Sequence, residues 1–188
     1  WGDLEKDTFN WERAASLYAQ AQDEWTRAPT SKHSDHVILR MVSADSLPAA
    51  EGREVLDKAN LIFGDLNDRT GLGDVSMRYG DLEYRDGNLT TARNHYGKAR
   101  TYYIDGPHPD REAEAILHVA RIDLARGYNV QAAYGLDLAE PIYLRAGNHG
   151  GLAIVRVFRG DVARLTGELD QAGGEYAAAA AAFNALSH

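Results

Sequence analysis

The side chains that could do chemistry are scattered along the chain and form no known catalytic pattern. Two of its seven histidines, His33 and His36, lie three residues apart and could supply two metal ligands from one helix face. No third ligand beyond Asp35 is evident, so we interpret them as solvated histidines. The 28 acidic residues show no spacing of an acid–base pair, and hydrolase, zinc-protease and kinase signatures are absent. We therefore predict no catalytic, metal or cofactor site, and a protein that is not an enzyme.

Three arginines have a regular spacing. Arg78, Arg121 and Arg164 follow one another at equal intervals along the sequence. A guanidinium group binds a carboxylate through two parallel hydrogen bonds, so a row of such arginines could hold acidic groups of an extended or helical peptide. The alternative is that these arginines pair with Asp81, Asp161 and other nearby acids as ordinary surface charges, which contribute about 0–1 kcal/mol each. Both interpretations remain open from the sequence.

The elements that would position these side chains recur with a period of roughly 40 residues, which is typical of helical repeat proteins. Gly80-Asp81-Leu82-Glu83 and Gly160-Asp161-Val162 begin two similar blocks that are two periods apart. Each block carries two small residues seven positions apart, with a larger residue between them. The first small position holds Ala14, Gly52, Ala92, Ala132 and Ala172, the large position holds Tyr18, Leu56, Tyr96, Leu136 and Tyr176, and the second small position holds Ala21, Ala59, Ala99, Ala139 and Ala179.

This pattern predicts helix–turn–helix units. Gly87, Gly127 and Gly167 fall where a first helix should end in a turn that needs positive φ. Small residues seven apart share one helix face and let a neighbouring helix approach closely. The sequence therefore predicts an all-α, superhelical solenoid of stacked units, with a last helix near Leu169–Leu186 and with Pro141 kinking or shortening the helix that contains it.

We expect a single repeat domain over residues 1–188, with units at about 1–31, 32–72, 73–112, 113–152 and 153–188. The start at Trp1 and the repeat register predict a fragment of a longer chain. The alanine-rich stretch 177–182, with Tyr176 and Phe183, could also let the C-terminal helix form a homo-oligomer. Two glycine-rich stretches, 71–73 and 147–151, are interpreted as turns between repeats, because no strand precedes them as in a phosphate-binding loop.

The spacing of Gly80, Gly87, Ala92, Tyr96 and Ala99 resembles the signature of the tetratricopeptide repeat (TPR) family. The period is longer than the usual TPR length of about 34 residues. It is similar to the TPR-like arrays of kinesin light chain and of bacterial STAND-type regulators. The resemblance implies a protein- or peptide-binding scaffold, the sensing or interaction part of a bacterial regulator acting in signalling or transcription regulation.

In such arrays the first helix of each unit lines a concave groove, and the resemblance implies that the partner lies there. The arginines would bind partner carboxylates, while Tyr84 and Phe158 would supply rigid aromatic contact area. The groove residues implied by the register are Met77, Arg78, Asp81, Tyr84, Arg85, Leu117, His118, Arg121, Leu124, Phe158, Asp161 and Arg164.

The composition of the chain argues against several classes of function and partner. The net charge of −8 argues against nucleic-acid binding by this segment. The chain has no cysteine and no apolar run that could span a bilayer, so we expect a cytoplasmic protein with no membrane partner. Two alternatives to the scaffold stay open: a homo-oligomerisation module that uses an open solenoid end, and a small-molecule-binding α-solenoid.

Overall fold

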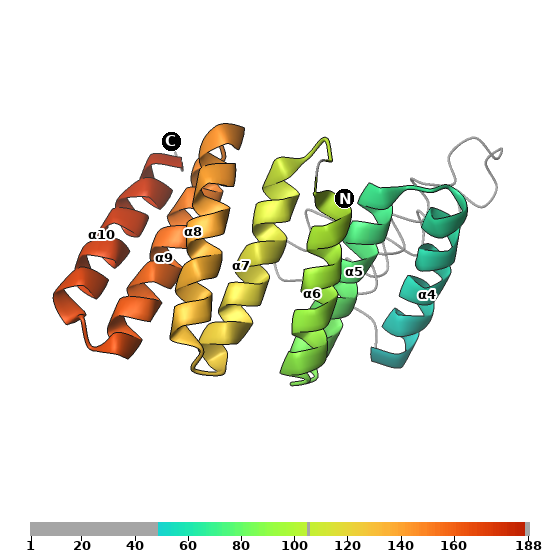
Figure 1. Cartoon of the computed structure of the whole chain (residues 1–188), viewed down its shortest axis with the longest axis horizontal. Helices are drawn as coiled ribbons and strands as arrows, with labels where there is room; N and C mark the ends of the chain where they lie inside the picture. Colours follow the sequence, from blue (N-terminus) through green and yellow to red (C-terminus); the bar gives the residue numbers. More distant parts are fainter. Residues whose placement is uncertain (1–48, 105, 187–188) are drawn as a thin grey trace. The chain divides into compact units, whose positions relative to one another are not determined.

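The computed structural model describes residues 49–104 and 106–186, and within them it contains seven α-helices and no strand. The helices are α4 (Ala49–Asp65), α5 (Arg69–Arg85), α6 (Leu89–Tyr103), α7 (Pro109–Ala125), α8 (Asn129–Ala146), α9 (His149–Thr166) and α10 (Leu169–Leu186) (Figure 1). The predicted all-α class is confirmed, as is the last helix. The first expected unit, the opening part of the second, and the pair His33 and His36 lie outside the described residues.

The chain divides into two compact units, one up to Asn88 and one from Leu89 onward. In the first unit, α4 packs against α5 around Leu56, Phe63, Val75 and Leu82, all of which are buried. A hydrogen bond from Tyr79 to Asp57 and an ion pair between Arg53 and the buried Glu83 also join these two helices.

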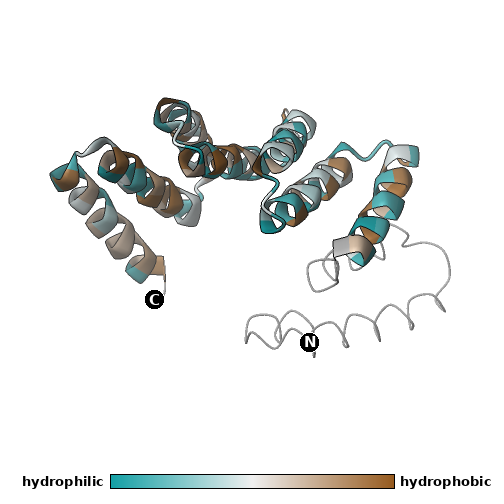
Figure 2. Ribbon diagram, turned by 90° about the horizontal axis from the view of Figure 1, so that it is seen from below, coloured by the Kyte–Doolittle hydropathy of each residue, from teal (hydrophilic) through white to brown (hydrophobic). Residues whose placement is uncertain are grey.

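The second unit contains α6 to α10, which lie side by side in chain order (Figure 1). Each helix packs against the next, most extensively within the pairs α7–α8 and α9–α10. Helix α7 also touches α9, its neighbour but one, so these two first helices form a common surface. Figure 2 shows hydrophilic and hydrophobic residues alternating around the helices, as expected when each buries one face.

The recurring small residues lie where helices meet. Among the described repeats, Ala92, Ala132 and Ala172 at the first small position, and Ala99, Ala139 and Ala179 at the second, are at most 4% exposed. Tyr96 and Leu136, between them, are fully buried, whereas Tyr176 is only half-buried. The alanines therefore act as predicted, by letting adjacent helices approach.

The helix ends share one turn. Asn67, Gly87, Gly127, Gly147 and Gly167 have positive φ and recur at half the repeat period, a series interrupted only at Pro107 among the described residues. At each of these turns the next backbone N–H returns to a carbonyl five residues earlier, as from Asn88 to Glu83 and from Tyr128 to Asp123. Positive φ at Gly87, Gly127 and Gly167 was predicted and is confirmed. Proline cannot adopt it, and the α6–α7 connection accordingly differs.

The structure corrects the sequence interpretation at two places. Gly71 and Gly73 are not in a turn but inside α5, where both are buried. Of the two effects predicted for Pro141, shortening is wrong, because α8 continues past it to Ala146 and is as long as α9 and α10. A kink at Pro141 stays a prediction.

Candidate binding site

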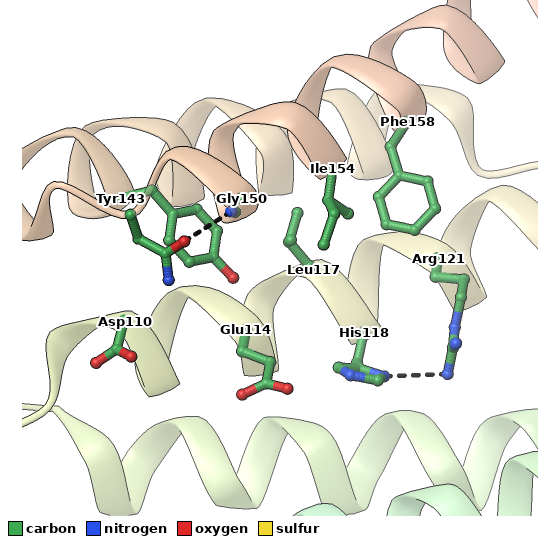
Figure 3. A pocket seen from close by; sticks show the side chains of 11 residues that line it. Asp110, Glu114, Leu117, His118, Arg121, Tyr143, Gly150, Ile154 and Phe158 are labelled. Carbon is green, nitrogen blue, oxygen red and sulfur yellow. Dashed lines mark hydrogen bonds between the residues drawn. The ribbon is translucent and has the colours of Figure 1, made fainter. Parts of the chain in front are cut away.

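A row of polar side chains runs along one face of α7. Asp110, Glu114, His118 and Arg121 are spaced by four, four and three residues, so they lie above one another on successive turns. Figure 3 shows this order along the helix, with the two acids at one end and the guanidinium group at the other. Pro109 occupies the first turn of α7, where its missing N–H costs no hydrogen bond.

This row borders a pocket of about 470 Å³ that lies within the second unit. Helix α9 contributes Ile154 and Phe158 from the opposite side, and Leu117 of α7 lies between them and the polar row (Figure 3). The complete lining is Asp110, Glu114, Leu117, His118, Arg121, Tyr143, Asn148, Gly150, Gly151, Ile154 and Phe158. The site therefore combines an apolar centre with charged ends of opposite sign.

Tyr143, at the end of α8, lies at the acidic end of this pocket. Its side chain is 3% exposed, and burial raises the pKa of the phenol, with the negative charges of Glu114 and Asp110 raising it further. Asn148 caps α9 by accepting a hydrogen bond from the N–H of Gly151 at 2.8 Å. This end of the pocket therefore favours positive charge.

The opposite end is held by a small polar stack. An Nη atom of Arg121 lies 3.0 Å from Nδ1 of His118 and donates to the hydroxyl of Tyr96 at 3.4 Å. The rings of Tyr96 and His118 are 4.6 Å apart and tilted by 31°. Since Tyr96 is fully buried on α6, it gives the stack a fixed base. The guanidinium group is thereby oriented beside the pocket by an imidazole ring and a phenol hydroxyl.

A glycine makes room for the Tyr143 ring. A methyl group on Gly151 would lie 2.4 Å from two ring carbons of Tyr143, closer than atoms can approach. The same arrangement occurs two periods earlier, where a methyl group on Gly71 would lie 2.3 Å from the ring of Phe63. The glycine-rich stretches thus admit an aromatic ring at the start of a first helix.

The structure brings only part of the predicted groove together. Leu117, His118, Arg121 and Phe158 meet in the pocket, while Leu124 packs against the core nearby. Asp161 accepts hydrogen bonds from Tyr176 at 2.8 Å and from Arg164 at 3.4 Å. The ion pair between Arg164 and Asp161 on α9 agrees with the alternative interpretation, in which these arginines form ordinary surface pairs.

The remaining candidates lie on α5 in the first unit. Met77 is 8% exposed and belongs to the buried face. Arg78 lies 3.8 Å from Asp81, again as the surface-pair alternative expects. Tyr84 is half-buried and Arg85 exposed, both near the helix end. These five residues stay predictions for the groove.

Sequence reasoning missed the acidic end of the pocket. Asp110 sits in the His108-Pro109-Asp110 stretch at the start of α7, and Glu114 follows one turn later. Tyr143 was missed because only first helices were considered, although Phe63, Tyr103 and Tyr143 recur at the repeat period and all three are buried. That aromatic column was the available signal.

Outside the pocket, buried carboxylates form ion pairs that join successive helices. Arg93 on α6 forms two hydrogen bonds to Asp123 on α7, at 2.7 and 3.1 Å, and Asp123 is 2% exposed. Arg53 and Glu83 occupy the same two positions one period earlier. These pairs hold adjacent helices in register and lie outside the pocket.

The described part of the chain, residues 49–104 and 106–186, contains neither a metal-binding cluster nor a membrane-spanning helix. No three His, Cys, Asp or Glu side chains gather there closely enough to hold an ion. No helix of this described part is both long and apolar enough to cross a bilayer.

No protein-family model matches the sequence, and no curated protein sequence does. Solved structures do match. BtubC (BKLC) from P. vanneervenii superimposes with a TM-score of 0.75 at 15% identity, over 99% of this chain and 78% of that one. A putative kinesin light chain from Podosopora anserina with nearly identical TPR-like repeats gives 0.67 at 12% identity, over 96% and 90% of the two chains, and a variant of it gives 0.68.

The fold is TPR-like. The resemblance found in the glycine and alanine columns is therefore confirmed at the level of fold, which is what identities of 12–15% can show. A TPR-like helical repeat is a scaffold of stacked helical pairs, and its functional surfaces must be argued from the side chains it presents.

Proposed function

We propose that this TPR-like chain is a protein-binding scaffold that accepts a segment of a partner protein in the pocket between α7 and α9. The pocket carries the proposal: an apolar centre of Leu117, Ile154 and Phe158 inside a charged rim is the usual composition of a recognition site. Its volume of about 470 Å³ suits a few side chains of a peptide.

The proposed role is binding and not catalysis, in keeping with the absence of catalytic signatures from the sequence. We further propose that the chain serves as the sensing or interaction part of a bacterial regulatory protein in the cytoplasm. The support for this finer proposal is the resemblance of the repeat register to long-period TPR arrays.

Selection of peptide ligands tests the pocket directly. Random peptides of about 12 residues, long enough to cross the site when extended, would be displayed and selected on the whole chain. Selected peptides would then be titrated against Phe158→Ala and against Tyr134→Ala, a control on α8 whose side chain is 65% exposed and outside the lining. We expect Phe158→Ala to weaken binding about tenfold or more and Tyr134→Ala to leave it unchanged.

Circular dichroism of Phe158→Ala and of a milder variant, Ile154→Ser, checks that each remains helical. Equal affinity of all variants for the selected peptides would contradict the pocket as the binding site. Failure to select any peptide would count against the proposal as well.

Self-association through α10 is a second candidate. Only Ala172 and Ala179 of this helix are buried, whereas Leu169 and Phe183 are 68% and 40% exposed. Exposed apolar residues beside a run of alanines suit helix-to-helix contact with a second copy. Sedimentation velocity at several concentrations tests it: a dimer that Phe183→Ser abolishes would support this role, and a monomer at all concentrations would contradict it.

A further inference from the structure

We propose that the segment bound between α7 and α9 is dipolar: a cationic side chain lies against Asp110 and Glu114, an anionic one against Arg121, and an apolar one between them. This inference rests on the proposed function and specifies the chemistry of its ligand. It is carried by the charge order along α7, whose two acids and one arginine border the same pocket at opposite ends (Figure 3).

The apolar centre fixes what must lie between the charges. Leu117 on α7 faces Ile154 and Phe158 on α9, so the middle of the pocket offers hydrocarbon and an aromatic ring (Figure 3). A charged group placed there would lose water without gaining a partner, which is costly. An aliphatic or aromatic side chain of the ligand is therefore favoured at this point.

The acidic end selects a cation through two carboxylates one helical turn apart. Asp110 is half-buried and Glu114 exposed, so both can meet a ligand without complete desolvation. The buried phenol of Tyr143 and the side-chain oxygen of Asn148 add neutral polar groups at this end. An ammonium or guanidinium group can use such acceptors, whereas a carboxylate would be repelled.

The basic end selects an anion through an oriented guanidinium group. Arg121 is held by the ring nitrogen of His118 and the hydroxyl of Tyr96, so its direction is set before a ligand arrives. Preorganised donors lose less conformational freedom on binding than mobile ones. A carboxylate of the ligand is the natural partner of a guanidinium fork.

The distance between the two ends indicates a peptide and not a small metabolite. At about 1.5 Å per residue, Glu114 and Asp110 lie roughly 10 and 16 Å along the helix axis from Arg121. An extended peptide covers this distance with about three to five residues. The charges of a free amino acid are far too close together to reach both ends.

The test is a charge analysis of the selected peptides. The same displayed library of about 12 residues would be selected on the unmodified chain, on Asp110→Asn/Glu114→Gln and on Arg121→Gln. The control is Glu168→Gln/Asp170→Asn, near the start of α10, which changes the net charge as much as the first variant does but lies outside the pocket lining.

We expect peptides enriched on the unmodified chain to place a cation and an anion on either side of an apolar residue. The preference for a cation should disappear on Asp110→Asn/Glu114→Gln, the preference for an anion on Arg121→Gln, and neither on the control. In titrations, each pocket variant should lower the affinity of a dipolar peptide about three- to tenfold.

Enriched peptides of a single charge sign would overturn the dipolar inference, as would an identical charge preference on all four proteins. If such peptides still lose affinity with Phe158→Ala, the pocket survives as the binding site and only its ligand chemistry was wrong. If Phe158→Ala has no effect, or if nothing is enriched, both the proposed function and this inference fail.

Discussion

Among single residues, Arg93 and Asp123 show most clearly how the repeats are joined. The carboxylate is 2% exposed and receives two hydrogen bonds from a guanidinium group on the preceding helix. The pair Arg53 and Glu83 repeats it one period earlier. One period later the two positions hold Ala133 and Ala163, so these two positions can be apolar, while Arg159 of α9 pairs with Asp137 and Glu140 of α8 instead.

We predict that Arg93→Ala destabilises the second unit by about 2–3 kcal/mol, because Asp123 would remain buried without its cation. The double variant Arg93→Ala/Asp123→Ala, which copies the next junction of the chain, should recover at least half of that loss. Urea unfolding of the two single variants and the double variant measures the coupling. Additive losses in the double variant would contradict a direct interaction.

At the scale of helices, glycine has two opposite roles in this chain. Gly151 must lack a side chain because the Tyr143 ring occupies that space, whereas Gly173 in α10 has nothing within 4 Å of the position of a methyl group. Both lie inside helices, where glycine is about 1 kcal/mol less favourable than alanine. Only the first therefore has a packing reason.

We predict that Gly151→Ala destabilises the protein by about 1–3 kcal/mol, since the clash with Tyr143 outweighs the gain in helix propensity. The matched control Gly173→Ala should stabilise it by up to about 1 kcal/mol. Thermal unfolding of both variants compares them under one condition. A stable Gly151→Ala would mean that the ring can move away at little cost.

How far the sequence could predict this structure depends on the range of each interaction. The turns at Gly87, Gly127 and Gly167 and the alanine columns were predictable, because they are local and recur at a fixed period. The acidic half of the pocket was not, since Tyr143 and Asp110 meet only after α7, α8 and α9 have packed. Phe158 and Arg121 were included through the family resemblance.

At the scale of the molecule, burial is unevenly distributed within the second unit. Seven residues of α7 are buried, including Ile116, Leu117 and Ile122, but α10 buries only two alanines. Stability in repeat arrays is the sum of local terms, so helices with little buried apolar area open at lower free energy.

We predict that backbone amides of α10 exchange with deuterium at least tenfold faster than those of α7 at neutral pH, because α10 can open locally. Hydrogen exchange of the whole chain, read out on proteolytic fragments about as long as one helix, measures the rates of α7 and α10 separately. Equal protection in α7 and α10 would show that the whole unit opens in a single step.

The even spacing of the positive-φ turns has a consequence for how this chain can change length. Inserting or deleting one residue within a helix would rotate everything beyond it by about 100°, turning its alanine stripe away from its neighbour. Gains and losses that preserve packing must therefore come as whole helical hairpins. The connection at Pro107 carries no such turn, so insertions or deletions of any number of residues can occur there without rotating a helix. This connection lies just before α7, the helix that bears the polar row of the pocket.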